Sequence, residues 1–234
     1  MRKFTFALVT MSFVMSSLYA QEYSKKELDH WLNNPDAPLP VRKKHREINE
    51  GKLQFLDPVK FNSVMHSQNN ITISRDSLGT GWVRLNQCYR QLEPFPRVQI
   101  VYKYRNIRDL KILNYHKIAS AKVQGKSVQL TGVKKGASIC VKARIQSLQK
   151  TASGYQLKNG PFRRKFFDGY FPLRVSVKVT FPVELIKLIR VTPASKPGEI
   201  SPGLRIKKSR NQINLDATFE GVLNTRIDFA AIKH

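Results

Sequence analysis

The chain has 234 residues and is strongly basic, with 41 Lys or Arg against 16 Asp or Glu and a formal net charge of +25. Hydrophobic residues make up 41% of it, enough to build a folded core and to argue against a wholly disordered chain. Two cysteines and five unclustered histidines exclude a cysteine-rich metal-binding module.

The first 20 residues have the three-part layout of a secretory signal peptide. Met1-Arg2-Lys3 supplies positive charge, an apolar run follows, and small residues precede Gln21. The apolar run is about a dozen residues, whereas a membrane span needs roughly 20. We therefore expect cleavage after Ala20 and a bacterial, periplasmic or secreted protein.

Residues 21–60 are predicted to form a helical, proline-rich N-terminal arm. Ser24 and Glu27 have the spacing of a capping box, which predicts a helix over residues 22–34. Three prolines between Pro35 and Pro40 end that helix. A second short helix is expected over residues 41–50. The arm is a linker, a docking element or part of the following domain, and its sequence does not choose among them.

Residues 61–234 are predicted to form a basic β domain. Apolar residues alternate with polar or basic ones, as in half-buried strands, and turn-forming residues separate these runs. The pattern predicts an all-β fold, an antiparallel β-sandwich that is Ig-like or related, with a closed β-barrel as the second choice. The expected strands are Val98–Tyr104, Ala137–Ile145, Leu173–Phe181, Ile213–Phe219 and Leu223–Phe229. The expected turns lie at residues 79–81, 124–126, 135–136, 159–161 and 197–198.

Cys88 and Cys140 are expected to form one disulfide, because an exported protein folds in an oxidising compartment. The alternation of each strand points both cysteines away from the aliphatic face. The predicted bridge therefore joins neighbouring strands near the surface and does not cross the core.

Most of the positive charge lies in the β domain. Residues 61–234 carry 31 basic and 9 acidic side chains, and 13 Lys or Arg lie between Asp109 and Asp168 without a single acid. Such like charges repel one another, so they require solvent and counterions or an anionic partner. The alternation places Lys142 and Arg144 on one outward face, and Arg174 and Lys178 on another.

Residues 160–172 are the densest candidate for a binding site, because aromatic rings there alternate with cationic groups. Such a segment suits an anionic ligand through hydrogen bonds, stacking and cation–π contacts. The alternative is a loop whose rings plug the edge of the sandwich while its cations stay solvated. The candidate ligand-binding residues are Phe162, Arg163, Arg164, Lys165, Phe166 and Tyr170.

No catalytic or cofactor motif is present, so the sequence assigns no catalytic residue, metal or cofactor. The leading hypothesis is a non-enzymatic exported protein that binds anionic lipid, lipopolysaccharide, an anionic wall polymer or an acidic protein. Export disfavours nucleic acid as the partner. One alternative is a hydrolase or carbohydrate-active enzyme whose site is assembled from scattered residues. Another is a periplasmic assembly or chaperone factor. The oligomeric state has no signal in the sequence.

Overall fold

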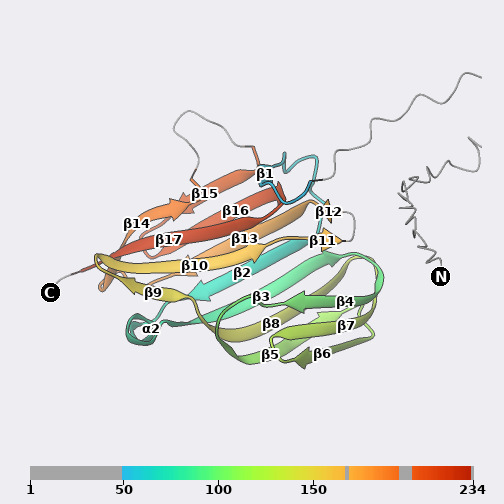
Figure 1. Cartoon of the computed structure of the whole chain (residues 1–234), viewed down its shortest axis with the longest axis horizontal. Helices are drawn as coiled ribbons and strands as arrows, with labels where there is room; N and C mark the ends of the chain where they lie inside the picture. The colour runs from blue at the N-terminus through green and yellow to red at the C-terminus, as the bar shows by residue number, and fades with distance from the viewer. Residues whose placement is uncertain (1–48, 167–168, 195–201, 233–234) are drawn as a thin grey trace, which may run out of the picture. The chain divides into compact units, whose positions relative to one another are not determined.

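A computed structural model describes residues 49–166, 169–194 and 202–232, which belong to one compact unit (Figure 1). Nearly all of its regular structure is β, with one short helix, α2 (Arg75–Thr80). The first strands are β1 (Gln54–Phe55), β2 (His66–Thr72), β3 (Trp82–Leu92), β4 (Phe95–Val101), β5 (Ile107–His116), β6 (Ser120–Gln124), β7 (Ser127–Val133) and β8 (Ala137–Gln146). The remaining strands are β9 (Leu148–Thr151), β10 (Gly154–Phe162), β11 (Lys165–Phe166), β12 (Gly169–Tyr170), β13 (Leu173–Thr180), β14 (Ile186–Thr192), β15 (Leu204–Lys208), β16 (Gln212–Glu220) and β17 (Leu223–Ala231).

The strands form one large sheet and three smaller ones. The large sheet has eight strands in the order β1-β16-β13-β2-β3-β8-β5, with β15 also paired to β16. The others are β14-β17-β10-β9, β4-β7-β6 and the two-stranded β11-β12. In Figure 1, the four-stranded sheet lies in front of β16, β13 and β2, and the three-stranded sheet lies in front of β8 and β5. These layers confirm the predicted all-β sandwich, and the open sheets of the described chain rule out the closed barrel.

The core lies between the large sheet and the two sheets that cover it. On β13, Leu173, Val175, Val177 and Val179 are at most 2% exposed, while the residues between them point outward. Burying one such aliphatic side chain contributes about 1.5–3 kcal/mol to the stability of the folded protein. The alternation therefore strongly determines which face of the strand turns towards the core. The same alternation occurs on β8 and β16, so the inner face of these strands is mostly aliphatic. On β2 and β3 the inner face also carries a buried polar cluster of Ser67, Asn69 and Gln87.

One pairing departs from the expected antiparallel arrangement: β2 and β13 are parallel, with Arg174 paired to His66 and Thr180 to Thr72. Every other pairing among the described strands is antiparallel. A parallel pair cannot be joined by a hairpin. Ten strands lie between β2 and β13 along the chain, so no local sequence pattern predicts that the two strands are neighbours.

The predicted turns had mixed outcomes. Residues 124–126 do form the turn between β6 and β7, with Gly125 at a φ of 55°. Residues 159–161 were predicted as a turn, but they lie inside β10, where the register with β17 shifts between Asn159 and Phe162. Gly160 has a φ of 114° there, so the glycine that suggested a turn serves a strand irregularity instead. Residues 79–81 end α2, and residues 197–198 lie outside the described chain.

The predicted signal peptide and both predicted helices of the arm, up to residue 48, lie outside the described residues. From residue 49 onward the arm is described, and Gln54 and Phe55 of β1 pair with Glu220 and Phe219 of β16. No helix in the described parts of the chain is long and apolar enough to cross a membrane.

Candidate anion-binding surface

The outer face of the large sheet carries basic side chains in rows that run across the strands. In one row Arg84 of β3, Arg144 of β8 and Arg108 of β5 are direct register partners. In the next row Lys142 of β8 faces Lys111 of β5. We call this surface the basic sheet face; its cations are Arg84, Arg90, Arg108, Lys111, Lys142, Arg144, Arg174, Lys178, Arg205 and Lys207.

The basic sheet face corrects the prediction of two separate outward faces. Lys178 of β13 pairs with Asn70 of β2, Asn70 pairs with Asn86 of β3, and Asn86 pairs with Lys142 of β8. These four residues therefore form one row of a single surface. The sequence predicted correctly that each side chain points outward, but strand order alone determines that β13 and β8 share a sheet.

The rows carry an energetic cost for the folded protein. Neighbouring strands lie about 4.8 Å apart, so the three arginines of the first row fall within about 10 Å. Like charges directly opposite each other on a sheet are destabilising. An anionic ligand or counterions would relieve this repulsion.

A groove of about 480 Å³ opens on the same face, over β2, β3, β13, β15 and β16. Its cations are Arg90, Lys178, Arg205 and Lys207, and Asp216 is the only acid among the described residues that line it. Amide side chains lie between the cations, including Gln68, Asn70 and Asn214. Amides both donate and accept hydrogen bonds, so the groove can bind hydroxyl groups as well as anionic ones.

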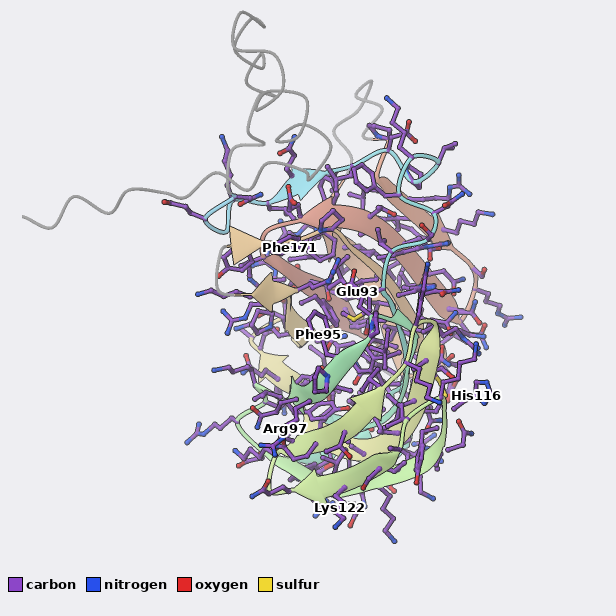
Figure 2. All side chains as sticks on the ribbon, turned by 90° about the vertical axis from the view of Figure 1, so that its right-hand side faces the viewer. Glu93, Phe95, Arg97, His116, Lys122 and Phe171 are labelled. Atoms are coloured by element: carbon purple, nitrogen blue, oxygen red, sulfur yellow. A yellow bond between two sulfur atoms is a disulfide. The ribbon has the colours of Figure 1, made fainter. Side chains whose placement is uncertain are left out.

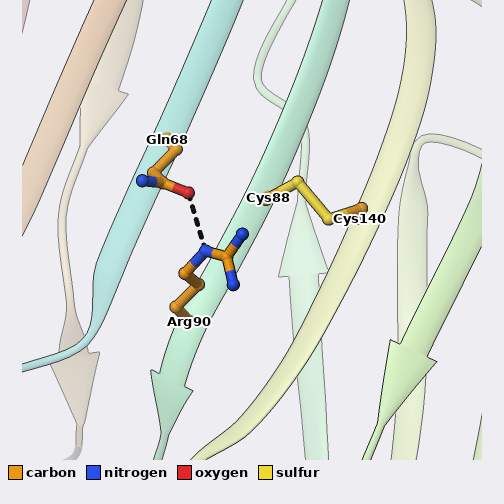
Figure 3. The surroundings of a disulfide bond; sticks show 4 residues. All are labelled: Gln68, Cys88, Arg90 and Cys140. Atoms are coloured by element: carbon orange, nitrogen blue, oxygen red, sulfur yellow. Dashed lines mark hydrogen bonds between the residues drawn. A yellow bond between two sulfur atoms is a disulfide. The ribbon is translucent and has the colours of Figure 1, made fainter.

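The centre of the basic sheet face is cross-linked. Cys88 of β3 and Cys140 of β8 are direct register partners and form a disulfide, with their Cα atoms 4.1 Å apart. Arg90 donates to Gln68 Oε1 on β2 at 2.8 Å, so side chains join three adjacent strands here (Figure 3). The predicted disulfide is confirmed, and it joins neighbouring strands of one sheet as expected.

His66, Ser176 and Asp216 form a hydrogen-bonded chain beside this groove. The Ser176 hydroxyl donates to Asp216 Oδ1 at 2.5 Å, and its oxygen lies 2.7 Å from His66 Nε2. Because the hydroxyl has one proton, Ser176 must accept from His66. Burial, followed by the charge of Arg174, lowers the pKa of His66 to about 4.

This chain does not have the order of a hydrolytic triad. In such a triad the serine donates to histidine, and the carboxylate accepts from the other ring nitrogen. Here Asp216 accepts from Ser176 directly, so His66 is not placed to take the serine proton. The three residues orient one another on the basic sheet face and do not form an activated nucleophile.

The predicted binding segment divides into structural and exposed residues. Phe162 is only 8% exposed and belongs to the core, so it is not available as a stacking platform. Tyr170 is half-buried, and its ring lies against Gly51. A Cβ atom added at Gly51 would come within 3.2 Å of that ring. Arg163 and Lys165 are exposed, and the Lys165 ammonium lies 5.7 Å from the Tyr170 ring. Phe166 pairs with Gly169 in the β11-β12 hairpin.

Arg164 is committed to contacts within the protein. It forms an ion pair with Glu93, donates to the Pro172 carbonyl at 3.1 Å and lies 5.5 Å from the Phe171 ring centre. Figure 2 labels Glu93 and Phe171, the partners that Arg164 contacts on this side of the protein. The alternative in which rings plug the sandwich edge thus describes Phe162 and Tyr170, whereas Arg164 is neither solvated as that alternative expects nor free for a ligand.

Two of the acids that the structure describes outside the basic sheet face contact arginines. Glu93 pairs with Arg164, and Asp228 accepts from Arg190 at 3.1 Å and lies 3.4 Å from Arg226. Hydrogen bonds from Gln156 and Arg190 hold the pKa of Asp228 below its usual value, against the opposing effect of desolvation. In the described residues no group of three or more His, Cys, Asp or Glu side chains could hold a metal ion.

No protein-family model matches the chain, and no curated protein matches it. Among solved structures, the M1 zinc metallopeptidase from Deinococcus radiodurans aligns with a TM-score of 0.38 at 10% identity. Its E323A mutant bound to a Tyr-Ser-Ala substrate gives the same TM-score at 11% identity. Each alignment covers 77% of this chain and 43% of that chain, so this chain spans less than half of the peptidase. We transfer no function across so weak a likeness.

Proposed function

We propose that the mature protein is an exported, non-enzymatic binding protein that holds an anionic polymer on its basic sheet face. The observation that carries this proposal is the alignment of cations in register rows across adjacent strands, as in Arg84, Arg144 and Arg108. A linear anion laid along such a row would meet several cations at once and would release its counterions on binding.

The groove indicates the class of polymer. Its cations alternate with amide side chains, as where Asn214 lies between Lys207 and Lys178. Carboxylates, sulfates or phosphates would pair with the cations, and hydroxyl groups would bond to the amides. An anionic polysaccharide carries both kinds of group, so we expect it to bind more tightly than an inorganic polyanion of equal charge.

The test is binding to heparin across a salt series, with Lys142→Glu, Arg144→Glu and Lys178→Glu combined in one variant. The matched control combines Lys122→Glu, Lys150→Glu and Lys187→Glu, three exposed lysines on β6, β9 and β14. Both variants lose the same net charge, so they separate a focused surface from diffuse attraction. Each lost cationic contact should reduce the slope of log affinity against log salt by about one.

We expect the sheet-face variant to lose most of its heparin affinity while the control stays near the wild type. An equal loss of heparin affinity in the two variants would overturn the proposal. It would show that binding depends on the net charge of the protein and not on the basic sheet face. Anionic vesicles form a second arm: vesicle binding that is stronger than heparin binding, and lost in the same variant, would assign the face to a membrane surface instead.

The hydrolase alternative is tested by assaying the purified wild type and Ser176→Ala for hydrolysis of ester and glycoside substrates. The order of hydrogen bonds among His66, Ser176 and Asp216 does not fit a serine nucleophile, so we expect no activity that depends on Ser176. A hydrolytic activity that the variant abolished would contradict this expectation and favour the enzyme.

A further inference from the structure

A second cleft, separate from the basic sheet face, opens between the layers of the sandwich. It has a volume of about 400 Å³. Its walls come from β2, β3 and β13 of the large sheet, from β4 of the three-stranded sheet and from the end of β10. We call it the inter-sheet cleft. It lies where the two covering sheets meet above the large one.

Most of the buried side chains that line the inter-sheet cleft are apolar. Leu92, Ile100, Phe162 and Leu173 line it, and each is at most 8% exposed. Half-buried Val98 lies on the same wall. These side chains continue the core up to the opening, so a hydrocarbon that entered would exchange water for aliphatic contacts.

The opening is cationic. Lys103, Arg163 and Lys165 are exposed and line the cleft, and no acid is among the described residues that do so. Arg163 and Lys165 both belong to the predicted binding segment. The segment therefore meets an apolar cavity, which its sequence did not reveal.

The polar residues of the wall do not add negative charge. Ser67 and Tyr89 line the cleft, and both side chains carry a hydroxyl group. Burial raises the pKa of Tyr89 to about 12, so the phenol stays neutral at physiological pH. Among the described residues that line the cleft, an anion therefore meets no negatively charged side chain.

We infer that the inter-sheet cleft binds a single-chain anionic amphiphile, with the hydrocarbon against Leu92, Ile100 and Phe162 and the anionic head at Lys103 and Arg163. A liquid water molecule occupies about 30 Å³, so the cleft has room for roughly a dozen groups of that size. That capacity fits one medium-length acyl chain. The site is independent of the polymer proposed for the basic sheet face.

Three probes at concentrations below micelle formation test the inference by calorimetry: decanoate, 1-decanol and acetate. Decanoate should bind saturably, because it has both the chain and the charge. Decanol should bind about tenfold more weakly, since it lacks a charge-assisted contact at the opening, and acetate should not bind measurably. Equal affinity for decanoate and decanol, or binding of acetate as tight as decanoate, would overturn the inference.

Two variants locate the site. Lys103→Gln with Arg163→Gln should lower decanoate affinity about tenfold and leave decanol affinity within about twofold. Val98→Trp should fill the cleft and abolish binding of both, whereas Val123→Trp on β6, at a residue that is 40% exposed, serves as the control. Heparin affinity should not change in Val98→Trp. Decanoate affinity that survives both cleft variants, with their thermal melts cooperative, would show that the amphiphile binds elsewhere.

Discussion

Cys88 and Cys140 lie directly opposite each other on β3 and β8, in the row next to the pair formed by Asn86 and Lys142. The covalent link therefore lies in the middle of the basic sheet face, beside strands whose cations repel one another. It holds two central strands in register at the place where electrostatic repulsion opposes their pairing. The predictions below test this arrangement and the parts of the chain that flank it.

The disulfide should be present in exported protein and should stabilise it. The chain between the cysteines has a sequence separation of 52, for which the chain-entropy model gives about 4 kcal/mol as an upper value. Urea unfolding of the Cys88→Ala, Cys140→Ala double variant measures this loss. Labelling of denatured, non-reduced periplasmic protein should detect no free thiol, and two labelled cysteines would contradict the prediction.

Arg144→Gln should stabilise the fold and weaken polymer binding at the same time. Arg144 is exposed and lies opposite both Arg84 and Arg108, so its removal relieves two like-charge contacts. We expect a gain of about 0.2–0.5 kcal/mol at low salt that disappears at 1 M salt, where the screening length is about 3 Å. Lys150→Gln is the control, and a gain that persists at high salt would argue against an electrostatic origin.

His66 should make the protein less stable in acid. Its folded pKa of about 4 lies below the ordinary value of 6.5, so between these values the unfolded chain binds the proton more readily. The contribution is complete above pH 6.5 and is lost as the pH falls towards 4. After discounting for solvent it amounts to about 1–2 kcal/mol. The groups that set this pKa include Arg174, Arg90 and Asp216.

Unfolding free energies measured from pH 4 to 7 test the role of His66. The wild type should lose stability more steeply across this range than His66→Gln, which has no imidazole to protonate. Parallel pH profiles for the two proteins would show that another group controls the acid sensitivity.

Export should remove the predicted signal peptide. The mass of the protein recovered from a bacterial periplasm should correspond to a chain that begins at Gln21. A chain that retains Met1 and fractionates with the cytoplasm would refute both the cleavage and the predicted compartment.

Deleting residues 21–40 from the mature protein should leave the β domain folded. The described contacts of the arm begin later, at Asn49, whose carbonyl accepts from the Tyr170 amide, so this deletion removes none of them. A cooperative thermal melt close to that of the full mature chain is the expected result. A deletion as far as residue 56 should destabilise the domain, because it also removes the pairing of β1 with β16.

The sequence by itself determined which residues of each strand point inward. Leu173 to Val179 of β13 and Ala137 to Ile145 of β8 alternate so regularly that one register alone buries their aliphatic side chains. The same local rule placed both cysteines on the outward side of their strands. Burial of apolar side chains is a property of each strand, and it can be predicted without knowing the neighbours.

Only the tertiary structure decided which strands are neighbours. Lys178 and Lys142 share one surface because β2 and β3 lie between their strands. The parallel pairing of β2 with β13 joins strands that ten others separate along the chain. Likewise, Arg163 lines the inter-sheet cleft because the end of β10 lies near β4 in the folded protein. Such long-range contacts depend on the packing of the whole core, which a periodic pattern within one strand does not encode.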